Sequence, residues 1–155
     1  MDVIIQEAKS EADIDFITKH FEETIALWEN YEVTKESIDN RKKSVKEWIK
    51  QTNTHITVAL TSNDKIIGFN SLWITEGNSG ERCGKICILY IIPEYRGKGV
   101  AHKLKVEGEA WLKSQGIKRV ITEIDAKNER MLKISKDAGF KIKSFLMEKE
   151  FTNGG

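Results

Sequence analysis

A basic, glycine-containing turn stands between an apolar stretch and an amphipathic stretch of the chain. The sequence runs from ICILYII, through the only proline, to Arg96, Gly97, Lys98 and Gly99. Residues 100–115 then carry apolar side chains at three- and four-residue steps, which predicts a helix. A helix N-terminus offers N–H groups without intrahelical partners at the positive end of the helix dipole. Glycines let the backbone approach a bulky group, so we expect this turn to bind a phosphate or pyrophosphate.

Two familiar phosphate-binding loops do not fit this turn. The Walker pattern G-x-x-x-x-G-K-[ST] does not occur, and GKGVAH lacks the third small residue of the dinucleotide-binding fingerprint. A capped loop with solvated charges is the alternative. The apolar run before the turn and the helical pattern after it favour anion binding over that alternative.

The composition predicts one globular domain over residues 1–155, with 39% hydrophobic and 32% charged residues. A formal net charge of +1 argues against a nucleic-acid partner. We expect no leader peptide and no membrane association, because the apolar runs are too short, and therefore a cytoplasmic location. Cys83 and Cys87 have no nearby set of further ligands, so we expect two reduced thiols and no metal.

Periodicity along the chain predicts an alternation of strands and helices. Ser10 is expected to cap the first helix, and Trp28 to continue its buried apolar stripe. A loop is expected at 75–84. The predicted strands are 3–8, 55–60, 66–74, 85–92 and 118–124, with one or two more in 141–151. The predicted helices begin at Ser10 and about Thr34 and continue with 100–115 and 128–137.

Two motifs in this order resemble a known family. LYIIPEYRGKGVAHKL closely resembles the coenzyme A-binding motif of the GNAT N-acetyltransferase superfamily, and NERMLKISKDAGF (128–140) is similar to its second signature. The resemblance covers nearly the whole chain. It implies an α/β (α+β) GNAT fold, with a mixed, mostly antiparallel sheet and helices on both faces. It also implies direct transfer of an acetyl group from acetyl-CoA to a primary amine.

The resemblance implies a set of cofactor-binding residues. The pyrophosphate of acetyl-CoA would bind the N–H groups of the basic turn, and the pantetheine arm would lie along the end of the preceding strand. Asn128 would hydrogen-bond a pantetheine amide, cap a helix, or do both. The cofactor residues are Leu89, Tyr90, Ile91, Arg96, Gly97, Lys98, Gly99, Val100, Ala101 and Asn128.

Two groups are expected to act on the thioester. The backbone N–H of Ile91 would polarise the carbonyl. Family members usually carry a tyrosine acid four residues before the glycine of Gly-Phe, but this chain has Ser135 there, a shorter and much weaker acid. Ser135 could equally be an ordinary surface residue. The general base stays open between a carboxylate and a water chain, and no histidine is assigned a role; the carboxylate candidates are Glu76, Glu81 and Glu123.

The segment ALWENYEVTKES is expected to form one wall of the acceptor site, as the resemblance implies. Tyr31 would present an aromatic face, and Glu32 would attract a cationic amine. The partner would be a small-molecule or peptide amine, and the protein a monomer or homodimer. Two alternatives stay open: an acyl-CoA-binding or sensing module without turnover, and an enzyme with a longer acyl donor.

Overall fold

The computed structural model of the chain describes residues 2–77 and 79–152. These residues form two compact units, the first ending at Glu123 and the second beginning at Ile124. The first unit contains the sheet and helices α1 to α3, and the second contains helix α4 and the C-terminal tail. Among the described residues, none of the helices combines the length and the apolarity needed to cross a lipid bilayer.

The sheet of the first unit is mixed and mostly antiparallel. Neighbouring strands β1 to β4 run antiparallel in sequence order, and β5 lies parallel to β4 at the sheet edge. Helix α3 makes the crossover that a parallel pair requires. This arrangement confirms the predicted fold class. The strands are β1 (Val3–Glu7), β2 (Thr54–Thr61), β3 (Ile66–Glu76), β4 (Arg82–Ile91) and β5 (Val120–Thr122).

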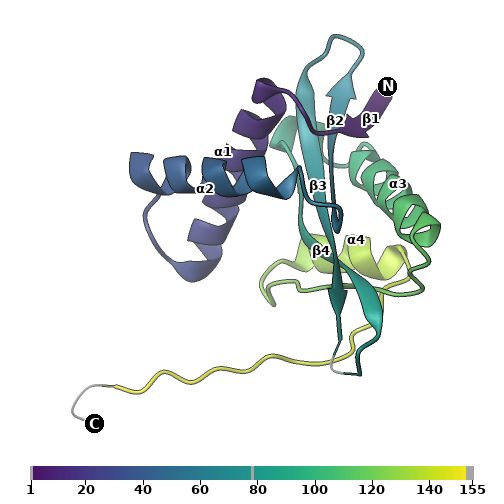
Figure 1. The fold of residues 1–155 in the computed structure, drawn as a ribbon. Coiled ribbons are helices and arrows are strands. Elements are labelled where there is room, and N and C mark those ends of the chain that lie inside the picture. The colour runs from purple at the N-terminus through teal and green to yellow at the C-terminus, as the bar shows by residue number, and fades with distance from the viewer. Residues whose placement is uncertain (1, 78, 153–155) are drawn as a thin grey trace. The chain divides into compact units, whose positions relative to one another are not determined.

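Helices cover both faces of this sheet (Figure 1). Helices α1 (Glu11–Glu29) and α2 (Lys35–Trp48) lie on one face, and α3 (Val100–Ser114) lies on the other. Ser10 caps α1 as predicted: its Oγ accepts from the Asp13 N–H at 3.1 Å. The Asp13 carboxylate accepts from the Ser10 N–H in return, at 3.0 Å. Thr34 forms the same reciprocal cap on α2 with Ser37, which fixes where both helices begin.

Each face of the sheet has its own apolar core because strand side chains alternate between faces. On the face of α1 and α2, Ile17, Phe21, Val58, Phe69 and Ile88 are buried together. On the face of α3, Ile67, Ile91, Val100 and Leu104 are buried with Ala59. Successive residues of β4 therefore face opposite cores, with Tyr90 in the core of α1 and α2 and Ile91 in the core of α3.

Three local predictions in the first unit were wrong. The predicted loop 75–84 is too long at both ends, because Thr75 and Glu76 belong to β3 and pair with Cys83 and Arg82 of β4. β5 is only three residues long, because β4 and β5 pair over a short stretch. Trp28 is 42% exposed. The apolar stripe of α1 is buried at Ile17 and Phe21, and the last turn carries Trp28 beyond that packing.

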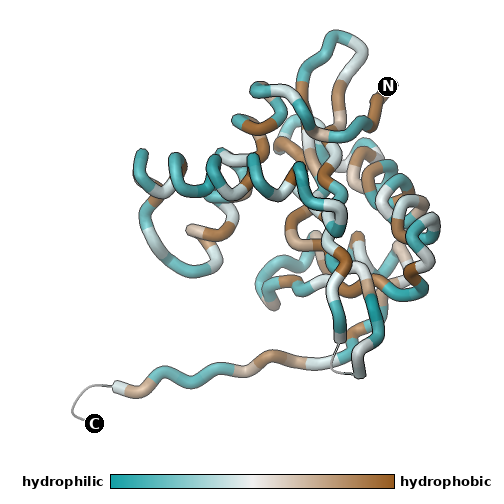
Figure 2. Tube along the Cα trace, viewed as in Figure 1, coloured by the Kyte–Doolittle hydropathy of each residue, from teal (hydrophilic) through white to brown (hydrophobic). Residues whose placement is uncertain are grey.

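The second unit has one helix and an extended tail. Helix α4 (Glu129–Asp137) begins after Asn128, whose Oδ1 accepts from the Met131 N–H at 3.1 Å. The strands predicted in 141–151 are wrong: residues 141–152 contain no strand. Apolar stretches are visible along this tail in Figure 2. The sequence there has strand-forming side chains, but a strand also needs a partner edge for its backbone groups. The exposed apolar side chains of the tail are Ile142, Phe145, Leu146, Met147 and Phe151.

Candidate active site at the open edge of strand β4

Strand β4 carries one extra residue in the middle of its pairing with β3. Ser71 pairs with Ile88 and Leu72 pairs with Ile86, so Cys87 is an unpaired bulge residue. The buried hydroxyl of Ser71 occupies the irregular position: its Oγ accepts from the Ile88 N–H at 2.9 Å and donates to the Ile88 carbonyl at 3.0 Å. The backbone N–H and carbonyl of Ile88 beside the bulge are therefore hydrogen-bonded by a side chain of β3.

The bulge changes which backbone groups of β4 face β5. Below it, the Gly84 N–H donates to the Arg119 carbonyl, on the β5 side. Above it, the Ile92 N–H donates to the Ile67 carbonyl of the β3 side. Strand alternation then directs the N–H and C=O groups of Leu89 and Ile91 away from β3. Without the extra residue, the same alternation would direct them at β3.

Strands β4 and β5 pair only from Gly84 to Ile86 on β4 and from Val120 to Thr122 on β5. Among the described residues, no strand pairs with β4 beyond Ile86 on this side. The backbone groups of Leu89 and Ile91 therefore lie at an open sheet edge. An extended chain can add to such an edge by hydrogen bonding like a further strand. The N–H of Ile91, which is expected to polarise the thioester carbonyl, is one of the groups at this open edge.

The open edge leads directly into the basic turn. A short 3-10 helix (Pro93–Tyr95) follows β4, and Gly97 and Gly99 take positive φ angles of 75° and 83°. A side chain on either glycine would meet no atom within 4 Å, so the space over the turn is open. The first N–H bonded inside α3 is that of Lys103, which donates to the Gly99 carbonyl. The N–H groups before it have no intrahelical acceptor.

Arg96 is held by the strand that precedes it. Its Nε donates to the Ile91 carbonyl at 2.8 Å, and its guanidinium lies 5.6 Å from the centre of the Tyr90 ring. The Ile91 carbonyl at the open edge is thus already hydrogen-bonded. The sequence predicted only that Arg96 supplies charge for the anion, and not that it also binds the end of β4. The terminal guanidinium nitrogens still carry that charge.

His20 of α1 lies against the same strand, a contact that sequence reasoning missed. Its imidazole stacks on the Tyr90 ring, with ring centres 4.4 Å apart and planes 16° apart. Nδ1 lies 3.5 Å from the Glu23 carboxylate. Burial lowers the pKa of His20 below its ordinary 6.5, although Glu23 opposes this shift. The spacing His-x-x-Glu could have indicated the His20–Glu23 pair, because such residues are neighbours on one helix face. The contact of His20 with Tyr90 depends on the tertiary structure.

The predicted acceptor wall, residues 26–37, contacts a buried carboxylate of α1 through Tyr31. Glu22 is 2% exposed, and it accepts from Tyr31 Oη at 2.8 Å and from Arg41 Nε at 2.9 Å. Burial alone would raise the pKa of Glu22, but these hydrogen bonds outweigh burial and lower it. A cavity of about 300 Å³ lies beside these three residues. Tyr31 keeps 39% of its surface exposed, and Glu32 is exposed.

The two predicted site residues of the second unit are the N-cap of α4 and a residue within α4. Asn128 caps α4, as the alternative role for it required. Ser135 is only 2% exposed, so the alternative that it is an ordinary surface residue was wrong. Burial leaves little room for a larger side chain at this position.

The carboxylates considered as bases are solvated. Glu123 is 80% exposed and lies 3.4 Å from Lys85 Nζ, and Glu81 lies 3.9 Å from Arg119. Glu76 is exposed at the hairpin end of β3. In the described part of the chain, no three His, Cys, Asp or Glu side chains form a group that could hold a metal ion.

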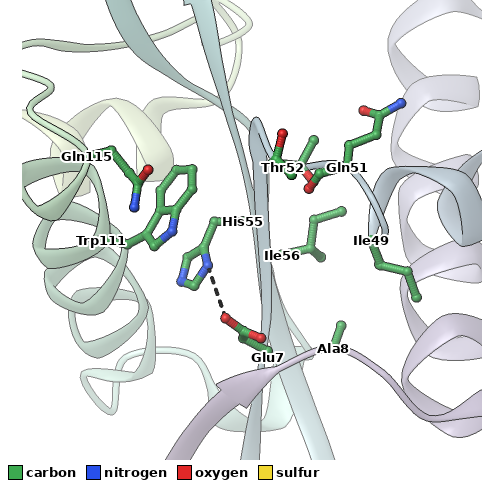
Figure 3. Close-up of a pocket in the computed structure, with 10 residues that line it drawn as sticks. Glu7, Ala8, Ile49, Gln51, Thr52, His55, Ile56, Trp111 and Gln115 are labelled. Atoms are coloured by element: carbon green, nitrogen blue, oxygen red, sulfur yellow. Dashed lines mark hydrogen bonds and ion pairs between the residues drawn. The ribbon is translucent and has the colours of Figure 1, made fainter.

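A second cavity, of about 280 Å³, lies where β1 ends beside the start of β2 (Figure 3). His55 points into this region and stacks on Trp111 of α3, with ring centres 4.7 Å apart. Its Nε2 is 2.8 Å from the Glu107 carboxylate, and its Nδ1 is 3.9 Å from Glu7. None of the residues of the basic turn lines this cavity.

Comparisons with known proteins agree with this geometry. The model of the acetyltransferase (GNAT) family matches residues 19–140. A mycothiol acetyltransferase of Propionibacterium freudenreichii is 24% identical over 106 residues, which cover 68% of this chain and 33% of that protein. The chain thus spans about a third of the length of this curated relative.

Solved structures share the fold along nearly the whole chain. An aminoglycoside 6'-N-acetyltransferase of Acinetobacter baumannii has a TM-score of 0.73 at 16% identity, covering 99% of this chain and 100% of that one. A protein of Bacillus halodurans described as a transcriptional regulator has a TM-score of 0.80 at 19% identity, covering 97% and 100%. At these identities the likeness shows the fold alone. Because the family model spans both motifs and most of the sequence, the chain belongs to the acetyltransferase (GNAT) family.

Proposed function

We propose that this chain is an acetyl-CoA-dependent N-acetyltransferase that transfers the acetyl group directly to a primary amine. The observation that carries the proposal is the continuity of the open β4 edge at Leu89 and Ile91 with the turn at Gly97 and Gly99. A pantetheine arm needs an unpaired strand edge, and a pyrophosphate needs unbonded N–H groups. Both surfaces follow one another within thirteen residues, 89 to 101.

The cofactor would be held by the backbone more than by side chains. We assign the pyrophosphate to the N–H groups from Gly97 to Ala101, with charge from Lys98 and from the terminal nitrogens of Arg96. We assign the pantetheine arm to the edge at Leu89, beside Tyr90. The Ile91 carbonyl is bonded to Arg96, so its N–H is the group at this residue that remains for the thioester carbonyl.

Bound acetyl-CoA would supply an acyl group already activated as a thioester. The Ile91 N–H would stabilise negative charge on the carbonyl oxygen during attack. Holding both substrates in one orientation supplies much of the acceleration in such a reaction. A covalent enzyme intermediate is unnecessary. Ser135, as a support for the leaving sulfur, and Asn128, as a partner of a pantetheine amide, are proposed from the resemblance.

The acceptor is proposed to be a small-molecule or peptide amine. The curated relative is named for acetylation of mycothiol, and one structural neighbour for acetylation of an aminoglycoside nitrogen. Tyr31 and Glu32 are the residues of this chain proposed to meet the amine. Both are exposed, and Tyr31 lines the cavity at Glu22.

Calorimetry with acetyl-CoA, followed by an amine panel, tests this function. The panel contains an aminoglycoside, a polyamine, a lysine-containing peptide and a peptide with a free N-terminus. Release of free thiol together with an acetylated product is the expected result. Acetyl-CoA binding without product from any amine would favour a binding module, and no binding would overturn the proposal.

A further inference from the structure

We infer that His20 is the general base that takes the proton from the acceptor amine, a role that rests on the proposed function. The imidazole lies on the α1 face of the sheet and is stacked on Tyr90 at 4.4 Å. Tyr90 separates Leu89 from Ile91, whose backbone groups lie at the open edge. Consecutive strand residues are about 3.3 Å apart along the chain. The ring is therefore held on the α1 face of β4, against the side chain of the residue that precedes Ile91.

The surroundings of His20 favour a proton on Nδ1 and leave Nε2 as the nitrogen that would accept the proton of the substrate. Nδ1 is buried without a hydrogen-bond partner among the described residues, and the Glu23 carboxylate lies 3.5 Å from it. A proton on Nδ1 is favoured there by the negative charge, which leaves the lone pair on Nε2. Catalytic contacts of this length commonly shorten when substrate binds.

The charges around His20 suit a base that works near neutral pH. Its own helix supplies Glu23 and Lys19, which act in opposite directions on its pKa. From β4 it faces Tyr90, whose ring also lies 5.6 Å from the Arg96 guanidinium. Burial lowers the pKa of His20, so the imidazole is neutral at pH 7 and able to accept a proton. The exposed carboxylates Glu76, Glu81 and Glu123 have no comparable position.

The proton balance of the step is complete. The acceptor first loses its ammonium proton to solvent, since a primary amine is mostly protonated near neutral pH. The neutral amine nitrogen then forms a bond to the carbonyl carbon as the carbon–sulfur bond breaks. The nitrogen gives its proton to His20 Nε2, and the sulfur leaves with the electron pair. The thiolate then takes one proton, so the net products are an amide and coenzyme A. His20 returns its proton to solvent, which it reaches because its side chain is 13% exposed and that of Glu23 is 47% exposed.

The first test compares His20→Gln with His102→Gln, whose histidine is exposed on α3. The wild-type enzyme is expected to show an acid limb of kcat/KM below an apparent pKa under 6.5, with a slope of one added to that from protonation of the acceptor amine. His20→Gln should lose this limb and lower kcat/KM at pH 7.5 by roughly 100-fold or more. Its acetyl-CoA affinity should stay within about twofold of wild type. His102→Gln should keep both the limb and the rate.

The second test moves the pKa without removing the imidazole. Glu23→Gln should shift the acid limb to lower pH, because the Glu23 charge favours protonation of His20. Lys19→Gln should shift it to higher pH, because the Lys19 charge opposes protonation. NMR titration of the His20 ring in the free protein should show the same two shifts. If His20 had only a structural role, the pH of the acid limb of kcat/KM would not change in Glu23→Gln or Lys19→Gln.

Three outcomes decide the inference. Parallel shifts of the limb and of the ring titration, with the loss in His20→Gln, support it. If the wild-type enzyme turns over and His20→Gln retains at least a fifth of its rate or keeps the acid limb, the role of His20 is overturned. The proposed function is unaffected by that outcome. A wild-type protein that binds acetyl-CoA but acetylates no amine overturns the proposed function, and the role of His20 with it.

Discussion

Arg96 Nε donates a hydrogen bond of 2.8 Å to the carbonyl oxygen of Ile91. The first residue of the basic turn therefore fixes the last residue of β4, and one side chain joins the two proposed cofactor surfaces. This contact also removes one acceptor from the open edge. Only the Ile91 N–H and the backbone groups of Leu89 remain there for a ligand.

Arg96→Ala is expected to weaken acetyl-CoA binding by roughly 10- to 100-fold, because it removes a charge-assisted contact and a brace of β4. Calorimetry on the folded variant measures the effect. Lys113→Ala, which removes a charge from the last turn of α3, is the control and should bind normally. Equal affinity in the two variants would remove Arg96 from the cofactor site.

Gly99→Ala is expected to weaken acetyl-CoA binding, because its methyl group would enter the space proposed for the pyrophosphate. Gly116→Ala is a matched control: its φ is 74° against 83° for Gly99, and neither added Cβ meets an atom within 4 Å. Both variants should lose similar stability, about 1–2 kcal/mol from the left-handed conformation. Thermal unfolding and calorimetry separate the effects, and weakening of both or neither would contradict the assignment.

Ser135→Ala should lower kcat by about tenfold or less while acetyl-CoA affinity is unchanged, since one neutral hydrogen bond contributes about 1 kcal/mol. Ser135→Tyr would supply the better acid typical of the family. Because Ser135 is 2% exposed, the larger ring should instead destabilise the protein by overpacking. Steady-state kinetics and thermal melts test both variants; a loss of several thousandfold in Ser135→Ala would give this serine a larger role.

Tyr31→Phe is expected to lower the free energy of unfolding by about 1.5–3 kcal/mol, because Tyr31 Oη donates to the buried Glu22 carboxylate. Glu32→Gln should leave stability unchanged and raise the acceptor KM, with acetyl-CoA affinity constant. Urea unfolding and acceptor kinetics measure these effects. A wild-type acceptor KM in Glu32→Gln would place the acceptor wall elsewhere.

The Glu22 carboxyl should also make stability depend on acid pH. Its pKa in the folded protein is lower than its ordinary 4.5. The stabilisation is therefore complete above that ordinary value and is lost as pH falls through the folded pKa. Urea unfolding from pH 6 to pH 3 should show a smaller acid-induced loss in Glu22→Gln than in wild type. An identical pH dependence of the two proteins would rule out this contribution.

Much of the fold could be predicted because local rules fix it. The caps at Ser10 and Thr34, the helix after the basic turn and the first four strands follow from side-chain period and from short-range hydrogen bonds. The tail at 141–151 shows the limit of these rules. Its residues suit a strand, but pairing depends on an edge that the local sequence does not specify.

The sequence by itself determined the basic turn, since positive φ at Gly97 and Gly99 and an uncapped helix N-terminus are local properties. It could not place His20 on Tyr90, 70 positions away along the chain, nor direct Arg96 to the Ile91 carbonyl. It also gave no sign that Cys87 is a bulge residue satisfied by Ser71. These contacts depend on strand register and helix packing, which the tertiary structure decides because they are set by interactions among distant segments.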